Sequence, residues 1–417
     1  MAFISAKTKR NTQIISLIGS GHGMSHYYGL ALPPLFPLIK AEFGVSYAAL
    51  GFLVTMLNIT SATVQVPMGF LVDRIGGRIL LPLGLGAMAI PFLAFGFADN
   101  YWFVLVLMAI AGIGSSVFHP VDYAILNATI DEDFLGRAFS LHTLTGNIGF
   151  MLAPVSVILF ASLWDWRTAL VISGGIGVVI MLVMIANGRI LHYDTDTKIA
   201  ESSKGTNARS EPSGLRILLL PQVILMSVFF VLITMMTTGI QTFSVTTLNQ
   251  THGTPLVEAT TVLTAFLVAG AFGVVFGGIL ADKWRRHTAL AITSISLIAG
   301  LLIFIGAVPL PIIVVTVIFI ATGFLQGTIR PARDMIVRSI IPDGSMGKVF
   351  GLLSTAMSVG HAITPVFLGW LIDRGMADMV FYVLAGVMLL AIPTMMAAQS
   401  PHIVRRSPAA ADKAAAE

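Results

Sequence analysis

Two apolar stretches of the chain each carry a proline and ionisable side chains in their middle. The first, SSVFHPVDYAIL at 115–126, contains His119 and Asp122, and the second, QGTIRPARDMIV at 326–337, contains Arg330. An imidazole and a carboxylate can take up and release protons, whereas a guanidinium stays charged and grips carboxylates or phosphonates through paired hydrogen bonds. These residue types predict proton chemistry or charge gating in the first stretch and anion binding in the second.

Helical spacing groups these side chains. His119 and Asp122 are three residues apart, so on a helix they share one face. The second stretch carries a matching polar stripe of Gln326, Arg330, Arg333 and Asp334. The proline in each stretch removes one backbone donor, which favours a kink lined by polar groups.

The composition places both stretches in a membrane. Of the 417 residues, 56% are hydrophobic and only 11% are charged, whereas soluble domains carry about 25% charged residues. A helix that crosses the hydrocarbon core needs roughly 20 apolar residues. We expect twelve such helices, near residues 12–39, 46–72, 79–98, 101–128, 136–163, 166–188, 219–246, 256–281, 287–307, 310–337, 346–372 and 377–398. The predicted fold class is an all-α membrane protein embedded in the lipid bilayer.

Several classes of chemistry are excluded. The chain contains no cysteine, so disulfides, thiolate metal sites and cysteine nucleophiles are absent. No Walker lysine loop, redox ligand set or soluble catalytic domain is visible. The basic residues are scattered over loops without interleaved aromatic side chains, unlike a nucleic-acid surface. We therefore expect no cofactor, no nucleic-acid partner and no enzymatic activity.

Basic residues predict the orientation, because Lys and Arg in short loops stay cytoplasmic. With both termini in the cytoplasm, only Lys40, Arg167 and Arg374 fall on the outer side, and the other 21 of the 24 lie on or near the inner side. We expect a multi-pass protein of the bacterial inner membrane with both termini cytoplasmic. A monomer suffices, because the pathway lies within one chain.

The chain divides into two similar halves. LGRAFSLHTLTGNIGFMLAP and MGKVFGLLSTAMSVGHAITP align at a shift of 211, which pairs Gly149 with Gly360 and sets His119 opposite Arg330. Parallel six-helix repeats are typical of transporters. We predict an N-terminal six-helix bundle at 1–188, a cytoplasmic linker at 189–218, a C-terminal six-helix bundle at 219–400 and a cytoplasmic tail at 401–417.

The loop GFLVDRIGGR at 69–78 resembles the signature loop of the major facilitator superfamily. It follows the second predicted helix, and a degenerate copy, GGILADKWRR, follows the eighth, with Arg285 where the second glycine would stand. The resemblance covers essentially the whole chain and implies two six-helix bundles that alternate around a central site. It also implies that the charged loop residues tune the inward and outward states: Asp73, Arg74, Arg78 and, in the copy, Asp282.

A narrower resemblance concerns the fourth and fifth predicted helices. GSSVFHP followed by GNIGFMLAP is similar to the fosmidomycin-resistance type of exporter within the superfamily. The chain departs from that type after the proline, where Val121 and then Asp122 stand in place of an immediate acidic residue. GFMLAP resembles the antiporter motif of the fifth helix, with Ala153 in place of the expected glycine. These resemblances imply efflux by proton antiport.

Two roles are open for Asp122. The resemblance implies that it pairs with Arg78 in the charge lattice that holds the cytoplasmic side shut. Alternatively, it takes up and releases the coupling proton while His119 tunes it. Arg330 is also open to two interpretations: it neutralises Asp334, four residues on, or it contacts an anionic substrate.

The first predicted helix offers a second polar set, GSGHGMSHYY. His22 and His26 are four residues apart, as in helical zinc sites, but no third acidic or sulfur ligand stands nearby, so we expect no metal. We expect them to line the substrate cavity with Tyr27, and the seventh helix to add Thr238 and Gln241. His142 and His361 are expected to be packing histidines with satisfied hydrogen bonds.

The sequence thus predicts a secondary active transporter that moves a small organic solute, anionic or amphipathic, outward in exchange for protons. The protein's partners would be this substrate, protons and the bilayer. One alternative is a proton-coupled importer of an organic anion, because residue types do not reveal direction. An alternative of another class is a membrane sensor or enzyme that kept the fold but no longer transports.

Overall fold

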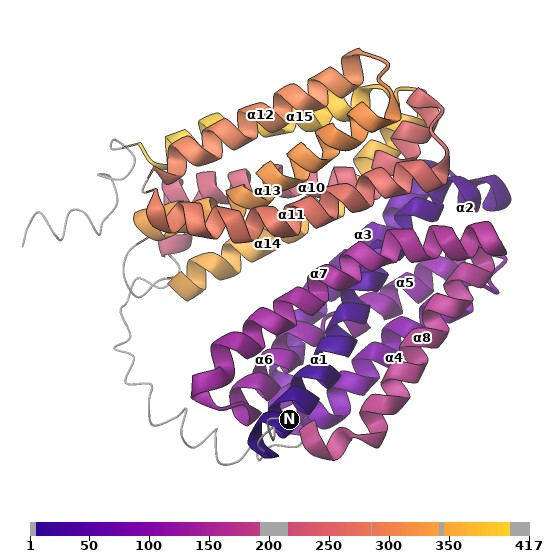
Figure 1. Cartoon of the computed structure of the whole chain (residues 1–417), viewed down its shortest axis with the longest axis vertical. Coiled ribbons are helices and arrows are strands. Elements are labelled where there is room, and N and C mark those ends of the chain that lie inside the picture. The colour runs from indigo at the N-terminus through magenta and orange to yellow at the C-terminus, as the bar shows by residue number, and fades with distance from the viewer. Residues whose placement is uncertain (1–5, 192–215, 285, 342–345, 401–417) are drawn as a thin grey trace, which may run out of the picture. The chain divides into compact units, whose positions relative to one another are not determined.

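The structure is a computed structural model that describes residues 6–191, 216–284, 286–341 and 346–400. Every regular element in these ranges is a helix (Figure 1). The chain forms two compact units: unit 1 comprises Met1–Val45 and Phe52–Arg209, and unit 2 comprises Ser46–Gly51 and Ser210–Glu417. The predicted tail at 401–417 and all but six residues of the predicted linker lie outside the described ranges, as does Arg285.

Unit 1 is a bundle in which α1 packs along α7 and α4 packs along α8 (Figure 1). Its elements are α1 (Ala6–Ala31), η1 (Pro33–Leu35), α2 (Phe36–Phe43), α3 (Tyr47–Ile75), α4 (Gly77–Phe95), α5 (Tyr101–Ser115), α6 (Phe118–Thr129), α7 (Glu132–Leu163), α8 (Trp166–Ala186) and η2 (Gly188–Leu191). The first residues of α3 belong to unit 2.

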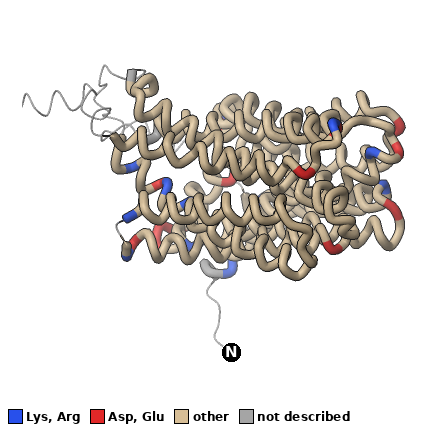
Figure 2. The backbone as a smooth tube through the Cα atoms, turned by 90° about the horizontal axis from the view of Figure 1, so that it is seen from above, with Lys and Arg blue, Asp and Glu red and all other residues tan. Residues whose placement is uncertain are grey.

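Unit 2 is a second bundle, in which α11 packs along α13 and α10 packs along α14 and α15. Its elements are η3 (Arg216–Leu219), α10 (Pro221–His252), α11 (Leu256–Lys283), α12 (His287–Ala307), α13 (Ile312–Ile340), α14 (Met346–Asp373) and α15 (Met379–Ala398). Most Lys, Arg, Asp and Glu positions along the backbone lie near helix ends, so the middles of the helices carry few charged residues (Figure 2).

The described residues include 11 helical segments long and apolar enough to cross a membrane, with Tyr101–Thr129 counted as one. The one predicted span not among these 11 is the first, 12–39, which corresponds to α1, whose polar residues lower its hydropathy. The prediction of one helix over 12–39 was wrong at its end. Pro33 and Pro34 follow α1, and because proline lacks an N–H and clashes within a helix, the chain forms a short 3-10 turn before α2 begins.

The two prolines have different effects. Before Pro120 the helix breaks between α5 and α6, as predicted, and the Ser116 hydroxyl donates to the carbonyl of Ile113 at 2.6 Å. At Pro331, by contrast, α13 continues without a break. Gly323 and Gly327 lie directly against the backbone of α11, and a proline is tolerated inside a membrane helix where neighbouring helices help to satisfy the backbone groups that it frees.

Glycines set the close helix crossings of each unit. On α7, Gly149 lies directly against the backbone of Gly23 on α1. Its predicted counterpart Gly360, on α14, lies against the carbonyl of Val231 on α10, where an added Cβ would approach within 2.9 Å. The repeat in sequence therefore appears as an equivalent helix crossing in each unit.

The signature loop needs its two glycines for different reasons. Gly76 has a φ of 83°, a left-handed conformation that disfavours side chains. Gly77 begins α4 and packs on Val121 and Ile125 of α6, where an added Cβ would lie 2.6 Å from Ile125. The loop is therefore packed against the helix that carries Asp122.

Candidate functional site

Asp122 lies at the centre of a cluster in unit 1 and is fully buried. Its Oδ2 atom is 2.9 Å from Nε2 of His142 on α7 and 3.2 Å from Nδ1 of His22 on α1. His22 and His142 are each 2% exposed. One carboxylate oxygen therefore joins three helices through two imidazoles.

Two further imidazoles complete this histidine cluster, which we define as His22, His26, His119, His142 and Asp122. The rings of His22 and His142 stack with centroids 3.7 Å apart. His26 and His119 lie 4.5 and 5.4 Å from His22, centroid to centroid. His119 is exposed and His26 half-buried, so the cluster extends from the buried carboxylate to the surface of unit 1.

The expected pairing of Asp122 with Arg78 is not seen among the described residues. Among the described residues the ionisable side chains paired with Asp122 are His22 and His142, and Arg78 instead packs its side chain against Gly188. His119 makes no hydrogen bond to the carboxylate in the described part of the chain but lies within its electrostatic reach. Residues three apart are offset by about 60° around a helix, which is enough to bury Asp122 while leaving His119 exposed.

The second candidate site, in unit 2, is the arginine site, which we define as Arg330, His361, Thr238 and Gln326. Arg330 is exposed although it lies within α13, and it has no hydrogen bond or ion pair with another described residue. Its positive charge lies within electrostatic reach of His361 on α14. His361 Nδ1 is 2.8 Å from the hydroxyl of Thr238 on α10.

Among the described residues Arg330 and Asp334 form no ion pair, although the Asp334 carboxylate acts on the guanidinium electrostatically. Asp334 accepts a hydrogen bond at 2.9 Å from Nε of its neighbour Arg333. The Arg333 guanidinium also lies 4.5 Å from the centroid of the Phe230 ring, a cation–π geometry. Both charges of this pair are thereby in close contact with other groups, whereas Arg330 makes no hydrogen bond or ion pair with a described residue.

Other predicted contacts are satisfied internally. Gln326 is buried and donates from Nε2 to the Thr237 hydroxyl at 2.8 Å. The Tyr27 hydroxyl is within 2.9 Å of the Ser156 and Ser173 hydroxyls, in the interior of unit 1. Gln241 is half-buried on α10. Gln326 and Tyr27 therefore act as supports rather than as free polar groups.

The charged loop residues lie where the sequence placed them, at helix ends. Asp73 and Arg74 are exposed in the last turn of α3, and Asp282 is exposed in the last turn of α11. Arg78 is exposed in the first turn of α4. None of the four has an ion-pair partner among the described residues.

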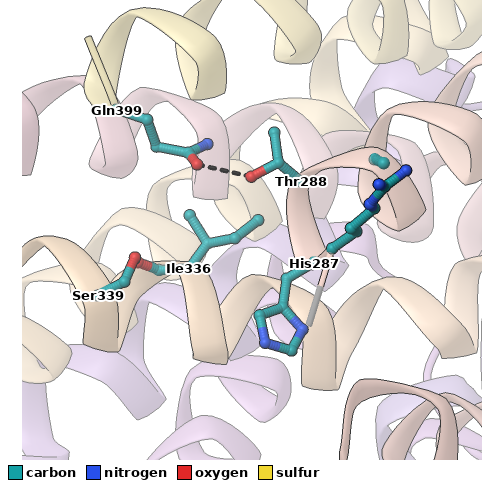
Figure 3. A pocket seen from close by; sticks show the side chains of 7 residues that line it. His287, Thr288, Ile336, Ser339 and Gln399 are labelled. Carbon is teal, nitrogen blue, oxygen red and sulfur yellow. Dashed lines mark hydrogen bonds between the residues drawn. The ribbon is translucent and has the colours of Figure 1, made fainter. Parts of the chain in front are cut away.

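A separate pocket of about 400 Å³ opens at one end of unit 2, between the start of α12 and the end of α13 (Figure 3). The Thr288 hydroxyl donates to Oε1 of Gln399 across it at 2.6 Å. Its lining consists of Arg286, His287, Thr288, Ala289, Ile336, Ser339 and Gln399. No predicted site residue lines this pocket, so it is distinct from the arginine site.

Sequence reasoning underestimated two histidines. Both were expected to be packing histidines with satisfied hydrogen bonds, and both do make one, but His142 makes it to the buried carboxylate and His361 to Thr238, within electrostatic reach of Arg330. The sequence offered one signal: each stands in a span where its counterpart in the repeat is apolar, Leu353 and Phe150 respectively. A polar residue that breaks a repeat within a membrane span is a candidate functional group.

Comparison with known proteins places the chain in a family. Residues 17–324 and 229–416 match the Major Facilitator Superfamily. The chain is 23% identical over 402 residues to the Fosmidomycin resistance protein of Escherichia coli (strain K12), covering 95% of this chain and 96% of that protein. It is 23% identical over 396 residues to the Uncharacterized MFS-type transporter YfnC of Bacillus subtilis (strain 168), covering 91% and 93%.

A solved structure has the same fold. The bacterial homolog to human lysosomal transporter, Spinster, in its inward-facing and occupied conformation, superimposes with a TM-score of 0.77 at 14% identity, covering 95% of this chain and 98% of that one. The predicted fold class and family resemblance are thus confirmed. With its many membrane-spanning helices and its match to the family over most of its length, the chain is a multi-pass membrane transporter that belongs to the major facilitator superfamily.

Proposed function

We propose that this transporter exports a small anionic or amphipathic organic solute in exchange for protons by alternating access. The feature that best supports an anionic substrate is the environment of Arg330. A guanidinium inside a membrane helix is costly without a partner, yet Arg330 makes no hydrogen bond or ion pair with a described residue. A substrate carboxylate or phosphonate would provide that partner through paired hydrogen bonds.

The surroundings of Arg330 suit a small ligand. The His361–Thr238 pair adds a hydrogen-bonding group beside the guanidinium, and binding sites for small molecules combine few polar groups with an apolar lining. Acidic residues that would attract a cationic solute are absent from α1 and α10. These features favour an anion or a neutral molecule over a cationic drug.

We assign proton coupling and gating to Asp122 because of the geometry of its contacts. The carboxylate holds His22 of α1 and His142 of α7, so a change at this group affects three helices together. No nucleotide loop is present to supply another energy source, which favours an ion gradient. The relationship to a fosmidomycin resistance protein supports a small organic substrate and efflux. In this proposal both termini are cytoplasmic and the protein works as a monomer.

Two alternatives differ from this proposal in direction or in class. Import of an organic anion would use the same Arg330 anchor with protons moving in the same direction as substrate. A sensor or enzyme without transport would need an output module or an ordered set of nucleophile and base. Neither is supplied by the described residues, in which the polar clusters lie within membrane helices.

The test is proton movement in energised inverted membrane vesicles that contain the full chain, followed with a pH-sensitive dye. Phosphonates, carboxylates and neutral drugs are added in turn, beside Arg330→Gln. The proposal expects proton release from the vesicle lumen for an anionic class, and its loss in the variant. Release by neutral drugs only, or by none of the compounds while the protein is folded and inserted, contradicts it.

A further inference from the structure

We propose that His22, Asp122 and His142 form a binding site for a divalent transition-metal ion. This inference does not depend on the transported substrate. Their ligand atoms Nδ1, Oδ2 and Nε2 all lie within 4.8 Å of one another, and all three residues are buried. Imidazole nitrogen and carboxylate oxygen are common ligands of zinc and its neighbours in the first transition row.

The distances already approach those of a metal site. Two ligand atoms that share a tetrahedral ion at about 2.0–2.1 Å are about 3.3 Å apart. The oxygen of Asp122 is 2.9 Å from His142 Nε2 and 3.2 Å from His22 Nδ1. Small side-chain movements would therefore replace the present hydrogen bond with coordination, without rearrangement of the three helices.

The charge and the unused acceptors point to a cation. The Asp122 carboxylate is fully buried, and no Lys or Arg among the described residues pairs with it. Its second oxygen, Oδ1, is buried without a hydrogen-bond partner in the described part of the chain. His22 Nδ1 faces the carboxylate but makes no hydrogen bond of good geometry. A bound cation would satisfy both atoms, which are otherwise costly to bury.

The histidine cluster also offers a path by which an ion could reach the site from the surface, and further ligands for it. His119 is exposed and its ring lies edge-on to His22, while His26 is half-buried beside the same ring. An ion could pass from these imidazoles to the buried carboxylate, and either one could complete the coordination. The set of two nitrogens and one carboxylate favours Zn²⁺ or Co²⁺ over Mg²⁺ and Ca²⁺, which prefer oxygen ligands alone.

The sequence argument against a metal rested on the pair His22 and His26 alone. That pair lacks a third ligand nearby in the chain. The fold supplies two ligands to His22 from elsewhere, Asp122 on α6 and His142 on α7. The candidate site is therefore made by three helices rather than by one.

Metal binding is tested on the purified full chain in detergent, stripped of metal and titrated with Co²⁺ while its visible absorption is followed. The expected result is one Co²⁺ per chain with a tetrahedral or five-coordinate spectrum, displaced by Zn²⁺. His142→Ala and Asp122→Asn should each weaken binding on the order of 100-fold, since changes even to groups behind the ligands cost 10–100-fold. His361→Ala, which removes an imidazole from the arginine site, should leave binding unchanged.

A second variant at His142 distinguishes the loss of a metal ligand from misfolding. His142→Gln keeps a polar side chain at this position, and it should elute as a single species and still lose Co²⁺ binding. The proposal is overturned if wild type binds no Co²⁺, or if folded His142→Gln and Asp122→Asn bind as wild type does. It is also overturned if His361→Ala removes the signal. Because the readout is the metal itself, failure here leaves the transport proposal untouched.

Discussion

His142 and Asp122 are 20 residues apart on different helices, yet Nε2 of the histidine lies 2.9 Å from Oδ2 of the aspartate. Since His22 approaches the same oxygen, the position of the carboxylate is fixed from both α1 and α7. Asp122 is therefore anchored inside unit 1 rather than offered to the signature loop. The carboxylate that the resemblance placed in a cytoplasmic charge lattice thus lies in the interior of unit 1.

The first prediction concerns Asp122→Asn. The amide keeps one oxygen for an imidazole but removes the charge, and hydrogen bonds to charged groups contribute about 1.5–3 kcal/mol. We expect transport to fall about 10- to 100-fold, as that energy implies, in vesicles containing equal amounts of protein. Arg78→Gln is the matched comparison, since Arg78 does not pair with the carboxylate. Equal losses in the two variants, with a shifted conformational balance, would instead favour the gate interpretation.

The second prediction concerns Arg330. Arg330→Gln should weaken binding of the anionic substrate about 100-fold, because a paired, charge-assisted contact is lost. Arg330→Lys should recover part of it, since an ammonium keeps the charge but not the planar fork. Ligand-induced thermal stabilisation measures the affinity. Arg338→Gln is the control: it changes an exposed residue in the last turn of the same helix and should bind the substrate as wild type does. Unchanged binding in Arg330→Gln would show that Arg330 does not hold the substrate.

Much of the fold could be predicted from the sequence, because spans of apolar residues and a repeat at one constant shift leave few alternatives. The break before Pro120 followed from its missing N–H, but α13 continues through Pro331, and its close contact with α11 could not be read from the proline alone. The site was harder to predict. The partners of Asp122 come from α1 and α7, and helical spacing within one span, which suggested His119, carries no information about neighbouring helices.

The third prediction tests the equivalent helix crossings. Gly149→Ala and Gly360→Ala would each push a methyl group into a neighbouring helix backbone, at Gly23 and Val231 respectively. Overpacking of this kind costs about 1–3 kcal/mol. We expect a lower unfolding temperature and less folded protein for both variants. Gly175→Ala, on α8 with open space around it, should be neutral or stabilise by about 0.5–1 kcal/mol; destabilisation equal to that of Gly149→Ala would argue against the close crossing.

The fourth prediction is a pH dependence at the start of α8. The pKa of the Asp165 carboxyl is lowered from 3.8 chiefly because it accepts the backbone N–H of Thr168, at 2.8 Å. The folded state thus favours the ionised form, so this stabilisation is complete above the ordinary pKa and is lost as pH falls through the lowered value. Asp165→Ala should have a lower unfolding temperature near neutral pH.

The difference between wild type and Asp165→Ala should shrink as the pH falls below about 4. Asp165→Asn, which keeps a side-chain oxygen for the helix start, should show a smaller effect without this pH dependence. Thermal unfolding of the detergent-solubilised protein across the acidic range makes the comparison. A gap between wild type and Asp165→Ala that is constant to the lowest pH would show that the carboxylate's charge plays no part.

The most direct test of proton-driven anion export is flux in proteoliposomes under an imposed pH gradient, with a responsive anion measured chemically inside the vesicles. The account predicts that substrate moves against the proton flow, that reversing the gradient reverses substrate movement, and that Arg330→Gln abolishes both. Substrate that moves together with protons would contradict export by exchange and favour the import alternative. Movement that ignores the gradient altogether would contradict proton coupling itself.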